Sequence, residues 1–144
     1  MKLRAFLVFS SVVLILFSCQ KKNPDEKSIS RSWEVSRQYV SGELKSIIAP
    51  PNEAIYTGIS IVIPIKSDGT VNVNTYFNST WVDFEIKDEQ QISFKNYGDS
   101  RLPEDENGVA FRENLLNTVK FEILNDKLLF INSQGHTIIE LVEN

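Results

Sequence analysis

A dominant alternation between positions 55 and 77, with most isoleucine, valine and phenylalanine residues on odd positions, is the feature that most constrains the fold of this chain. Successive side chains of a β-strand point to opposite faces, so a period of two predicts strands that each have one apolar face. A slip of one residue would exchange the two faces, so the parity also constrains how the strands pair. An earlier strand is expected to carry Trp33, Val35 and Tyr39 on one face. The odd set after it consists of Ile55, Thr57, Ile59, Ile61, Ile63, Ile65, Val71, Val73, Thr75 and Phe77.

In four predicted hairpins, the length of the loop brings the apolar faces of the two strands onto the same side of the sheet. The first has a three-residue loop at 67–69, with Gly69 at the left-handed position that such a loop favours. The second turns at 88–90, the third at 125–126 and the fourth at 133–136. The expected facing residues are Ile63 with Val73, Ile65 with Val71, the set Val82, Phe84 and Ile86 with Ile92 and Phe94, Phe121 with Phe130, Ile123 with Leu128, Leu128 with Leu141, and Phe130 with Ile139.

These hairpins predict a mainly β fold, an antiparallel β-barrel-like domain around one core, because closing a sheet removes the long edges that promote aggregation. Residues 95–108 break the period and are rich in turn formers. Apolar residues then recur at helical spacing. We therefore expect one short helix at about 108–118, which would plug one end of the barrel through Phe111 and Leu115.

The N-terminus resembles a bacterial lipoprotein signal. Basic residues at 1–4 precede an apolar run from Ala5 to Phe17, and Ser18 then leads into Cys19, the only cysteine in the chain. The run is too short for a transmembrane helix, and an ordinary secretory signal usually ends in an Ala-x-Ala-like site. We therefore expect cleavage before Cys19 and lipidation of its thiol, palmitate included. Several acyl chains together would make a stable membrane anchor.

This signal divides the chain into a signal peptide at 1–18, a flexible tether at 19–30 and a single β domain at 31–144. The expected location is the cell envelope, most simply the outer membrane. Acidic residues soon after the cysteine direct some bacterial lipoproteins to the cell surface. Because Asp25 and Glu26 follow Cys19, the sequence does not decide between the periplasmic and the surface face of that membrane. Cleavage removes two basic residues and no acid, so the formal net charge changes from −4 to −6. An acidic protein is a poor partner for nucleic acid, which binds clustered positive charge.

Four segments near the C-terminus share a pattern with a known family: an aromatic residue, a short helix ending in leucine, and then strands. This pattern resembles the C-terminal part of META-domain proteins, small bacterial envelope lipoproteins and heat-shock-associated proteins. Trp33 and the Asp68-Gly69 hairpin fit that family, and equally fit lipocalin-like domains of bacterial lipoproteins. Residues 74–79 lack the cysteine-containing segment that META domains often carry. The family has no well-defined enzymatic activity, so the resemblance implies a fold and a location. The matching segments are 111–116, 119–123, 126–130 and 135–139.

Residues that could carry catalytic or metal chemistry are sparse. His136 is the only histidine, lies in a predicted loop, and has neither ligand partners at metal spacing nor a Gly-x-Ser-x-Gly motif beside it. The acidic run at 104–107 lacks the alternating spacing of a calcium loop. Asp83 and Glu85 share a strand face opposite Phe84, which is typical of a wet outer surface rather than a glycosidase pair. We therefore expect no catalytic residue, no metal and no cofactor.

A candidate binding patch consists of three aromatic residues expected to point outward, Tyr56, Tyr76 and Trp81. Exposed aromatic clusters mark contact sites, although burial under the helix or a loop is the ordinary alternative. The sequence thus favours an outer-membrane-anchored lipoprotein with a non-enzymatic β domain, which binds another envelope protein or supports the envelope. The alternative is a lipocalin-like carrier of a small apolar ligand. A carrier needs an internal cavity, whereas a small barrel can be filled by its own side chains.

Overall fold

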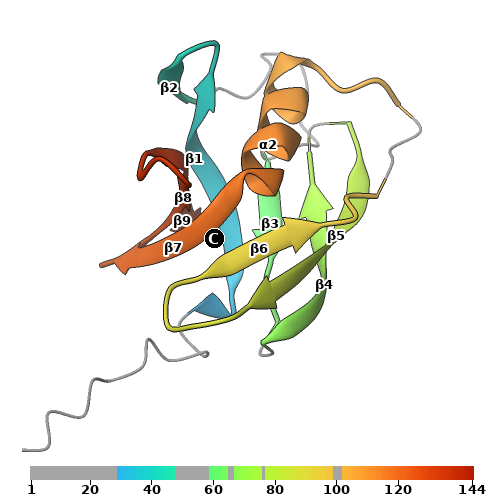
Figure 1. Cartoon of the computed structure of the whole chain (residues 1–144). Coiled ribbons are helices and arrows are strands. Elements are labelled where there is room, and N and C mark those ends of the chain that lie inside the picture. The colour runs from blue at the N-terminus through green and yellow to red at the C-terminus, as the bar shows by residue number, and fades with distance from the viewer. Residues whose placement is uncertain (1–28, 48–58, 65–66, 76, 99–101) are drawn as a thin grey trace, which may run out of the picture.

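The computed structural model describes residues 29–47, 59–64, 67–75, 77–98 and 102–144. These residues form one antiparallel sheet and the helix α2 (Glu106–Leu116), which lies across one end of the sheet (Figure 1). The strands follow the order β6-β5-β4-β3-β1-β9-β8-β7, with β2 paired to β1. Their bounds are β1 (Ser32–Val40), β2 (Glu43–Ser46), β3 (Ser60–Val62), β4 (Asp68–Asn74), β5 (Ser79–Ile86), β6 (Ile92–Lys95), β7 (Thr118–Leu124), β8 (Lys127–Asn132) and β9 (Thr137–Glu143).

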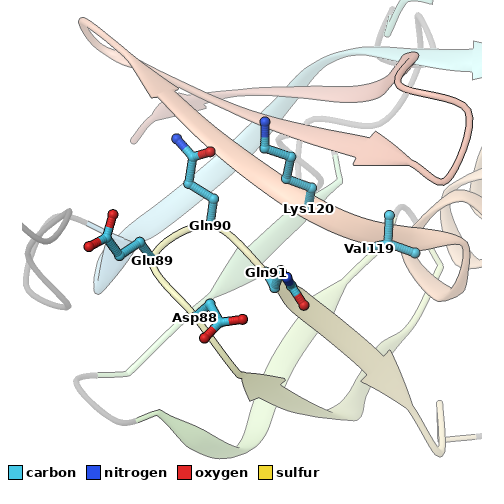
Figure 2. Close-up of a pocket in the computed structure, with 6 residues that line it drawn as sticks. All are labelled: Asp88, Glu89, Gln90, Gln91, Val119 and Lys120. Atoms are coloured by element: carbon cyan, nitrogen blue, oxygen red, sulfur yellow. The ribbon is translucent and has the colours of Figure 1, made fainter.

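The two ends of this strand order, β6 and β7, meet and nearly close the sheet into a barrel. Gln91 forms an isolated bridge with Lys120, and the Phe121 N–H donates to the Gln90 carbonyl at 2.8 Å. An open hollow of about 660 Å³ lies at this seam, between the loop before β6 and the start of β7 (Figure 2). The predicted barrel-like β fold is therefore confirmed.

Three of the four predicted hairpins have the predicted register. Phe84 opposes Phe94 and Ile86 opposes Ile92 across the β5–β6 loop. The β7–β8 and β8–β9 pairings also match, with Phe130 opposite both Phe121 and Ile139 on its two sides. Parity and loop length were sufficient here because each hairpin is short and its turn is tight.

The first predicted hairpin is wrong in register, although its parity is right. Val73 opposes Ile61 rather than Ile63, a shift of two residues that keeps the same side chains inside. The reason is that β4 makes a long ladder with β5, from Asp68 to Asn74, and this ladder uses residues that the loop was expected to contain. Gly69 lies within β4 opposite Phe84, at φ +146°, a conformation that favours glycine.

The prediction that Tyr39 shares the inward face of β1 is also wrong. The pairing of β1 with β9 shifts between Val35 and Arg37, which leaves Ser36 as an extra residue in a β-bulge. Beyond the bulge the even positions face inward, so Gln38 is buried and Tyr39 is 43% exposed.

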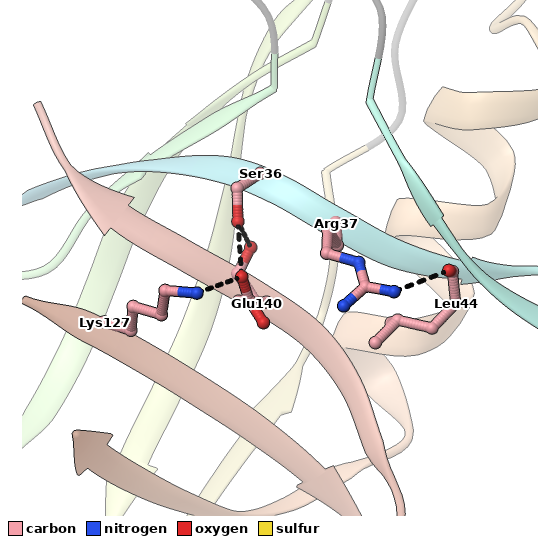
Figure 3. Close-up of polar contacts among 5 residues, drawn as sticks. All are labelled: Ser36, Arg37, Leu44, Lys127 and Glu140. Carbon is pink, nitrogen blue, oxygen red and sulfur yellow. Dashed lines mark hydrogen bonds and ion pairs between the residues drawn. The ribbon is translucent and has the colours of Figure 1, made fainter.

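Polar contacts hold this bulge on its outer side (Figure 3). The Ser36 hydroxyl donates to the Glu140 carbonyl at 3.0 Å, and Lys127 Nζ donates to Glu140 Oε1 at 2.8 Å. The hydrogen bond from Lys127 is the main reason that the pKa of Glu140 is lowered from its ordinary value.

Helix α2 begins two residues before its predicted start and closes one barrel end as expected. Asp105 caps it, because its carboxylate accepts a hydrogen bond from the Gly108 N–H at 2.8 Å. Phe111 and Leu115 are fully buried. The Asn114 side chain donates to the Tyr39 carbonyl at 2.8 Å, which ties the helix to β1.

The core is a single cluster of side chains from both halves of the barrel and from the helix. Ile59, Ile61 and Ile63, the centre of the alternating stretch, are at most 1% exposed. The Trp33 indole N–H donates to the Ile29 carbonyl at 2.9 Å, so this large ring is buried without leaving its polar group unpaired. Aliphatic and aromatic side chains therefore occupy the centre of the barrel.

A candidate binding face around Trp81

The most distinctive feature of the outer surface is a row of side chains across β3, β4 and β5. Val62 opposes Asn72, and Asn72 opposes Trp81, so the three are successive neighbours across the strands. All three are exposed, Val62 at 40% and Trp81 at 55%. Cross-strand neighbours on one face lie close enough for a single ligand to contact them together.

The Trp81 ring rests on Gly98. A Cβ added to Gly98 would lie 2.9 Å from Trp81 Cε2 and 3.0 Å from Trp81 Cδ2, the two atoms at which the indole rings are fused. Other ring atoms surround these two in the ring plane, so this approach comes from one face. The Gly98 N–H donates to the Trp81 carbonyl at 2.6 Å, and the Thr80 hydroxyl donates to the Gly98 carbonyl at 2.7 Å. One face of the indole is therefore covered and the other meets solvent.

A local change of backbone conformation brings Gly98 to this position. The register of β5 and β6, carried on past Lys95, would place Tyr97 opposite Trp81. Asn96 has a left-handed φ of +55°, which asparagine tolerates better than most residues, and one extra residue is accommodated there. Tyr97 then packs against the core, and Gly98 takes the place beside Trp81.

Polar side chains with fixed geometry flank the row on one side. The Thr70 hydroxyl donates to Asp83 Oδ1 at 2.8 Å, and the Asn96 amide donates to Asp83 Oδ2 at 2.9 Å. These hydrogen bonds, that of Asn96 first, hold the pKa of Asp83 below its ordinary value. Lys95 is the cross-strand partner of Asp83, so this flank carries one charge of each sign.

The other flank of the row carries amides and hydroxyls on β3, β4 and β5, and Glu34 of β1 lies opposite Ser60 at its end. The Asn74 amide donates to the Ser60 hydroxyl at 3.5 Å, and these two residues oppose each other on β4 and β3. Ser79 faces Asn74 from β5. Amides and hydroxyls both donate and accept hydrogen bonds, so this flank can match either kind of polar group on a ligand.

Of the predicted site residues, Trp81 is exposed, whereas Tyr56, Tyr76 and Cys19 lie outside the described residues. Asp83 and Glu85 share the outer face of β5. His136 is an exposed residue of the β8–β9 loop, and its backbone N–H donates to Asn132 Oδ1 at 3.0 Å.

Two side chains of the acidic run at 104–107 make structural hydrogen bonds within the fold. Glu104 Oε1 accepts hydrogen bonds from the Thr75 hydroxyl at 2.8 Å and from the Asn78 amide at 2.7 Å, while Asp105 caps the helix. Across the described parts of the chain, no three His, Cys, Asp or Glu side chains are grouped as a metal would need.

Two buried polar atoms close to this run were not predicted from the sequence. Glu104 Oε2 and the Tyr97 hydroxyl are inaccessible to solvent and have no hydrogen-bond partner. Burial, and next the nearby Glu104 carboxylate, raise the pKa of Tyr97 to about 12. The alternation indicates which face a tyrosine occupies, but it carries no signal for the partner of its hydroxyl.

The seam hollow is a weaker candidate for a binding site. The lining side chains come from one loop and one strand, and Figure 2 shows Glu89 pointing away from Val119 and Lys120. Ligand pockets are usually concave and lined by apolar residues, whereas five of the six residues that line this hollow are polar or charged and the hollow is open to solvent. The outer face around Trp81 combines an aromatic anchor with fixed polar neighbours, so it is the better candidate.

No family model matches this sequence, and no curated protein matches it either. Among solved structures, the fold is similar to the crystal structure of a DUF4847 family protein from Bacteroides vulgatus ATCC 8482, with a TM-score of 0.62 and 20% sequence identity. The match covers 83% of this chain and 96% of that one. This likeness places the chain in the same class of barrel-like β folds. Among the helices of the described residues, none has the length and apolar character needed to cross a bilayer.

Proposed function

We propose that this chain is a lipid-anchored outer-membrane lipoprotein whose barrel binds a partner through its outer surface, without catalysis. The observation that carries the proposal is the Trp81 indole, held on Gly98 with one face open to solvent. Tryptophan is enriched at binding hot spots, where a rigid aromatic anchor loses little entropy on binding. The neighbouring Asn72 and Asn74 are the adaptable polar contacts that usually surround such an anchor.

The buried apolar side chains at the centre of the barrel favour this outer binding over a carrier role. Ile61, Phe111, Leu128 and Phe130 come from three different elements, β3, α2 and β8, and are all fully buried. Side chains that fill a small barrel leave less room for an apolar ligand inside. An external partner needs no such room, so the exposed face is the natural place for recognition.

The anchor is the second part of the proposal and rests on the N-terminal signal. Cys19 would carry the acyl chains, and 20–30 would connect it to the barrel. The resemblance to META-domain lipoproteins stays a prediction that agrees with this location. Attachment to a membrane confines the barrel to the envelope, and a partner there is met at a high local concentration.

Two measurements test the two parts. Mass spectrometry of the full chain purified from a bacterial membrane should find acylated Cys19 as the first residue, and Cys19→Ala should stay uncleaved and unacylated. A photo-crosslinking amino acid at position 72, beside Trp81, should capture a partner in that membrane. The same group at Gln134, in the exposed β8–β9 loop, should not. An unacylated product refutes the anchor, and equal capture at both positions refutes the binding face.

A further inference from the structure

We infer that the partner of the Trp81 face is a neutral polysaccharide, one of whose sugar rings stacks on the open face of the indole. This inference rests on the proposed outer binding face and specifies its ligand. It follows from the shape of the aromatic surface, the donor and acceptor groups around it, and its charge.

The Trp81 indole offers a flat platform of fixed orientation. Gly98 covers one face of the ring, and the hydrogen bond from the Gly98 N–H to the Trp81 carbonyl fixes the two segments together. The π-face of an aromatic ring is negative, so it attracts the positively polarised C–H groups on the flat side of a pyranose ring. Because the platform is already in place, little conformational freedom is lost when a sugar binds.

Hydroxyl groups of a sugar need partners that both donate and accept. Asn72 lies next to Trp81, and Asn74, Ser60 and Ser79 form the next row along the same face. Amide and hydroxyl side chains supply both roles at every position. Both Asp83 oxygens already accept hydrogen bonds, and each keeps a free lone pair for a sugar hydroxyl.

The charge on this face favours a neutral ligand. Among the described residues of the row and its two flanks, the charged side chains are Asp83, its cross-strand partner Lys95, and Glu34 of β1, which lies opposite Ser60. These charges are few and of both signs, so a charged polymer meets no cluster of the opposite sign here. Nucleic acid, which needs clustered positive charge, does not fit the row.

The apolar content of the face argues for a sugar over a protein. A standard protein interface buries about 800 Å² on each partner, around a core depleted of charge and enriched in aromatic residues. Among the described residues of this row, Trp81 and Val62 are the large exposed apolar side chains. A single sugar ring covers one indole face, so this amount of apolar surface suits a saccharide.

Intrinsic fluorescence gives a direct readout of binding, since the chain contains two tryptophans and Trp33 is buried at 1% exposure. The acylated full-length protein in detergent would be titrated with neutral polysaccharides (β-glucan, xylan, mannan and galactan) and with acidic polygalacturonate. We expect a change in Trp81 emission and reduced acrylamide quenching with at least one neutral polymer. Polygalacturonate should produce neither effect.

Matched variants, followed by affinity electrophoresis in gels that contain the same polymers, identify the platform. Trp81→Ala should weaken retardation about tenfold, on the order of one aromatic contact, and Trp81→Phe should restore part of it. Tyr39→Ala removes another exposed aromatic residue and should leave retardation unchanged. Gly98→Ala should weaken binding while Trp81 is still present, because the added Cβ displaces both the Thr80 hydroxyl and the Trp81 ring.

The outcomes separate this inference from the proposed function. Retardation by no neutral polymer, or retardation that Trp81→Ala leaves intact, overturns the polysaccharide inference. Capture of an envelope protein at position 72 that depends on Trp81, without polysaccharide binding, overturns it while supporting the outer binding face. Circular dichroism of each variant confirms that the barrel is folded, so a loss of binding reports on the face.

Discussion

Replacing Tyr97 by phenylalanine is expected to stabilise the protein, although it removes a polar group from a partly buried side chain. The hydroxyl is buried without a hydrogen-bond partner, and burial of an unpaired polar group costs about 1–3 kcal/mol. Tyr97 retains some exposure, so we expect a gain of about 1 kcal/mol in the free energy of unfolding. For a domain of this size that raises Tm by roughly 3–6 °C.

The same hydroxyl makes the stability depend on alkaline pH. The pKa of Tyr97 is raised to about 12 by burial and by Glu104, above the ordinary value of 10.0 for an unfolded chain. A raised pKa gives stability that is complete below pH 10 and is lost as pH rises through 12. Two pKa units correspond to at most about 2.7 kcal/mol, and solvent screening reduces this to about 1 kcal/mol.

Guanidinium denaturation at pH 8 and at a series of pH values up to 12 measures both effects. Tyr97→Phe should have the higher midpoint at pH 8 and should lose less stability above pH 10. Tyr39→Phe is the matched control, since Tyr39 is 43% exposed and its stability change should be near zero. A loss of 1 kcal/mol or more in Tyr97→Phe at pH 8 would refute the reasoning, because it would mean that the hydroxyl is hydrogen-bonded.

Substitutions at three further positions test other parts of the fold by the same denaturation assay. Asp105→Ala removes the cap of α2 and should lower the free energy of unfolding by about 1 kcal/mol. Asp105→Asn should retain most of the stability, because asparagine also caps helices. Equal losses of stability in both variants would contradict the capping role. Gly69→Ala should cost about 1–2 kcal/mol because φ at this position is +146°, and an unchanged midpoint would argue against strain. The lowered pKa of Glu140 gives stability that is present above its ordinary pKa of 4.5 and is lost as pH falls further. Lys127→Met should flatten this acid dependence, and a parallel pH profile would contradict the ion pair.

The sequence predicted those parts of the fold that depend on parity alone. The loop length determines whether a residue opposes a position of the same or of the opposite parity, and in three hairpins the loop length matched the apolar faces: β5–β6 pairs even with even positions, whereas β7–β8 and β8–β9 pair odd with even ones. Parity could not distinguish Ile61 from Ile63 as the partner of Val73, because a shift of two residues leaves the same face inside. The neighbouring β4–β5 ladder decided the register, and that is a property of the whole sheet.

The sequence pattern did not show where single extra residues are inserted into the strands. Ser36 lies in a bulge that reverses the inward face of β1, and Asn96 accommodates an extra residue that places Gly98 beside Trp81. Each inserted residue depends on contacts with a strand that is distant in the sequence, so no local pattern predicts it. The outward position of Trp81 was predictable from alternation, whereas the covered face of its ring was not.

The direction of β1 gives the barrel a polarity with respect to anything attached before it. β1 starts at the end of the barrel away from α2, and its later residues contact the helix through Gln38 and Tyr39 (Figure 1). A tether that reaches the barrel at Ile29, whose side chain is buried in the core, therefore holds the molecule by the end away from α2. An acyl chain on Cys19 would orient the helical end away from the bilayer. The Trp81 face, on the side wall of the barrel, would then be roughly perpendicular to the membrane plane. Long polymers that run along an envelope surface can reach it there.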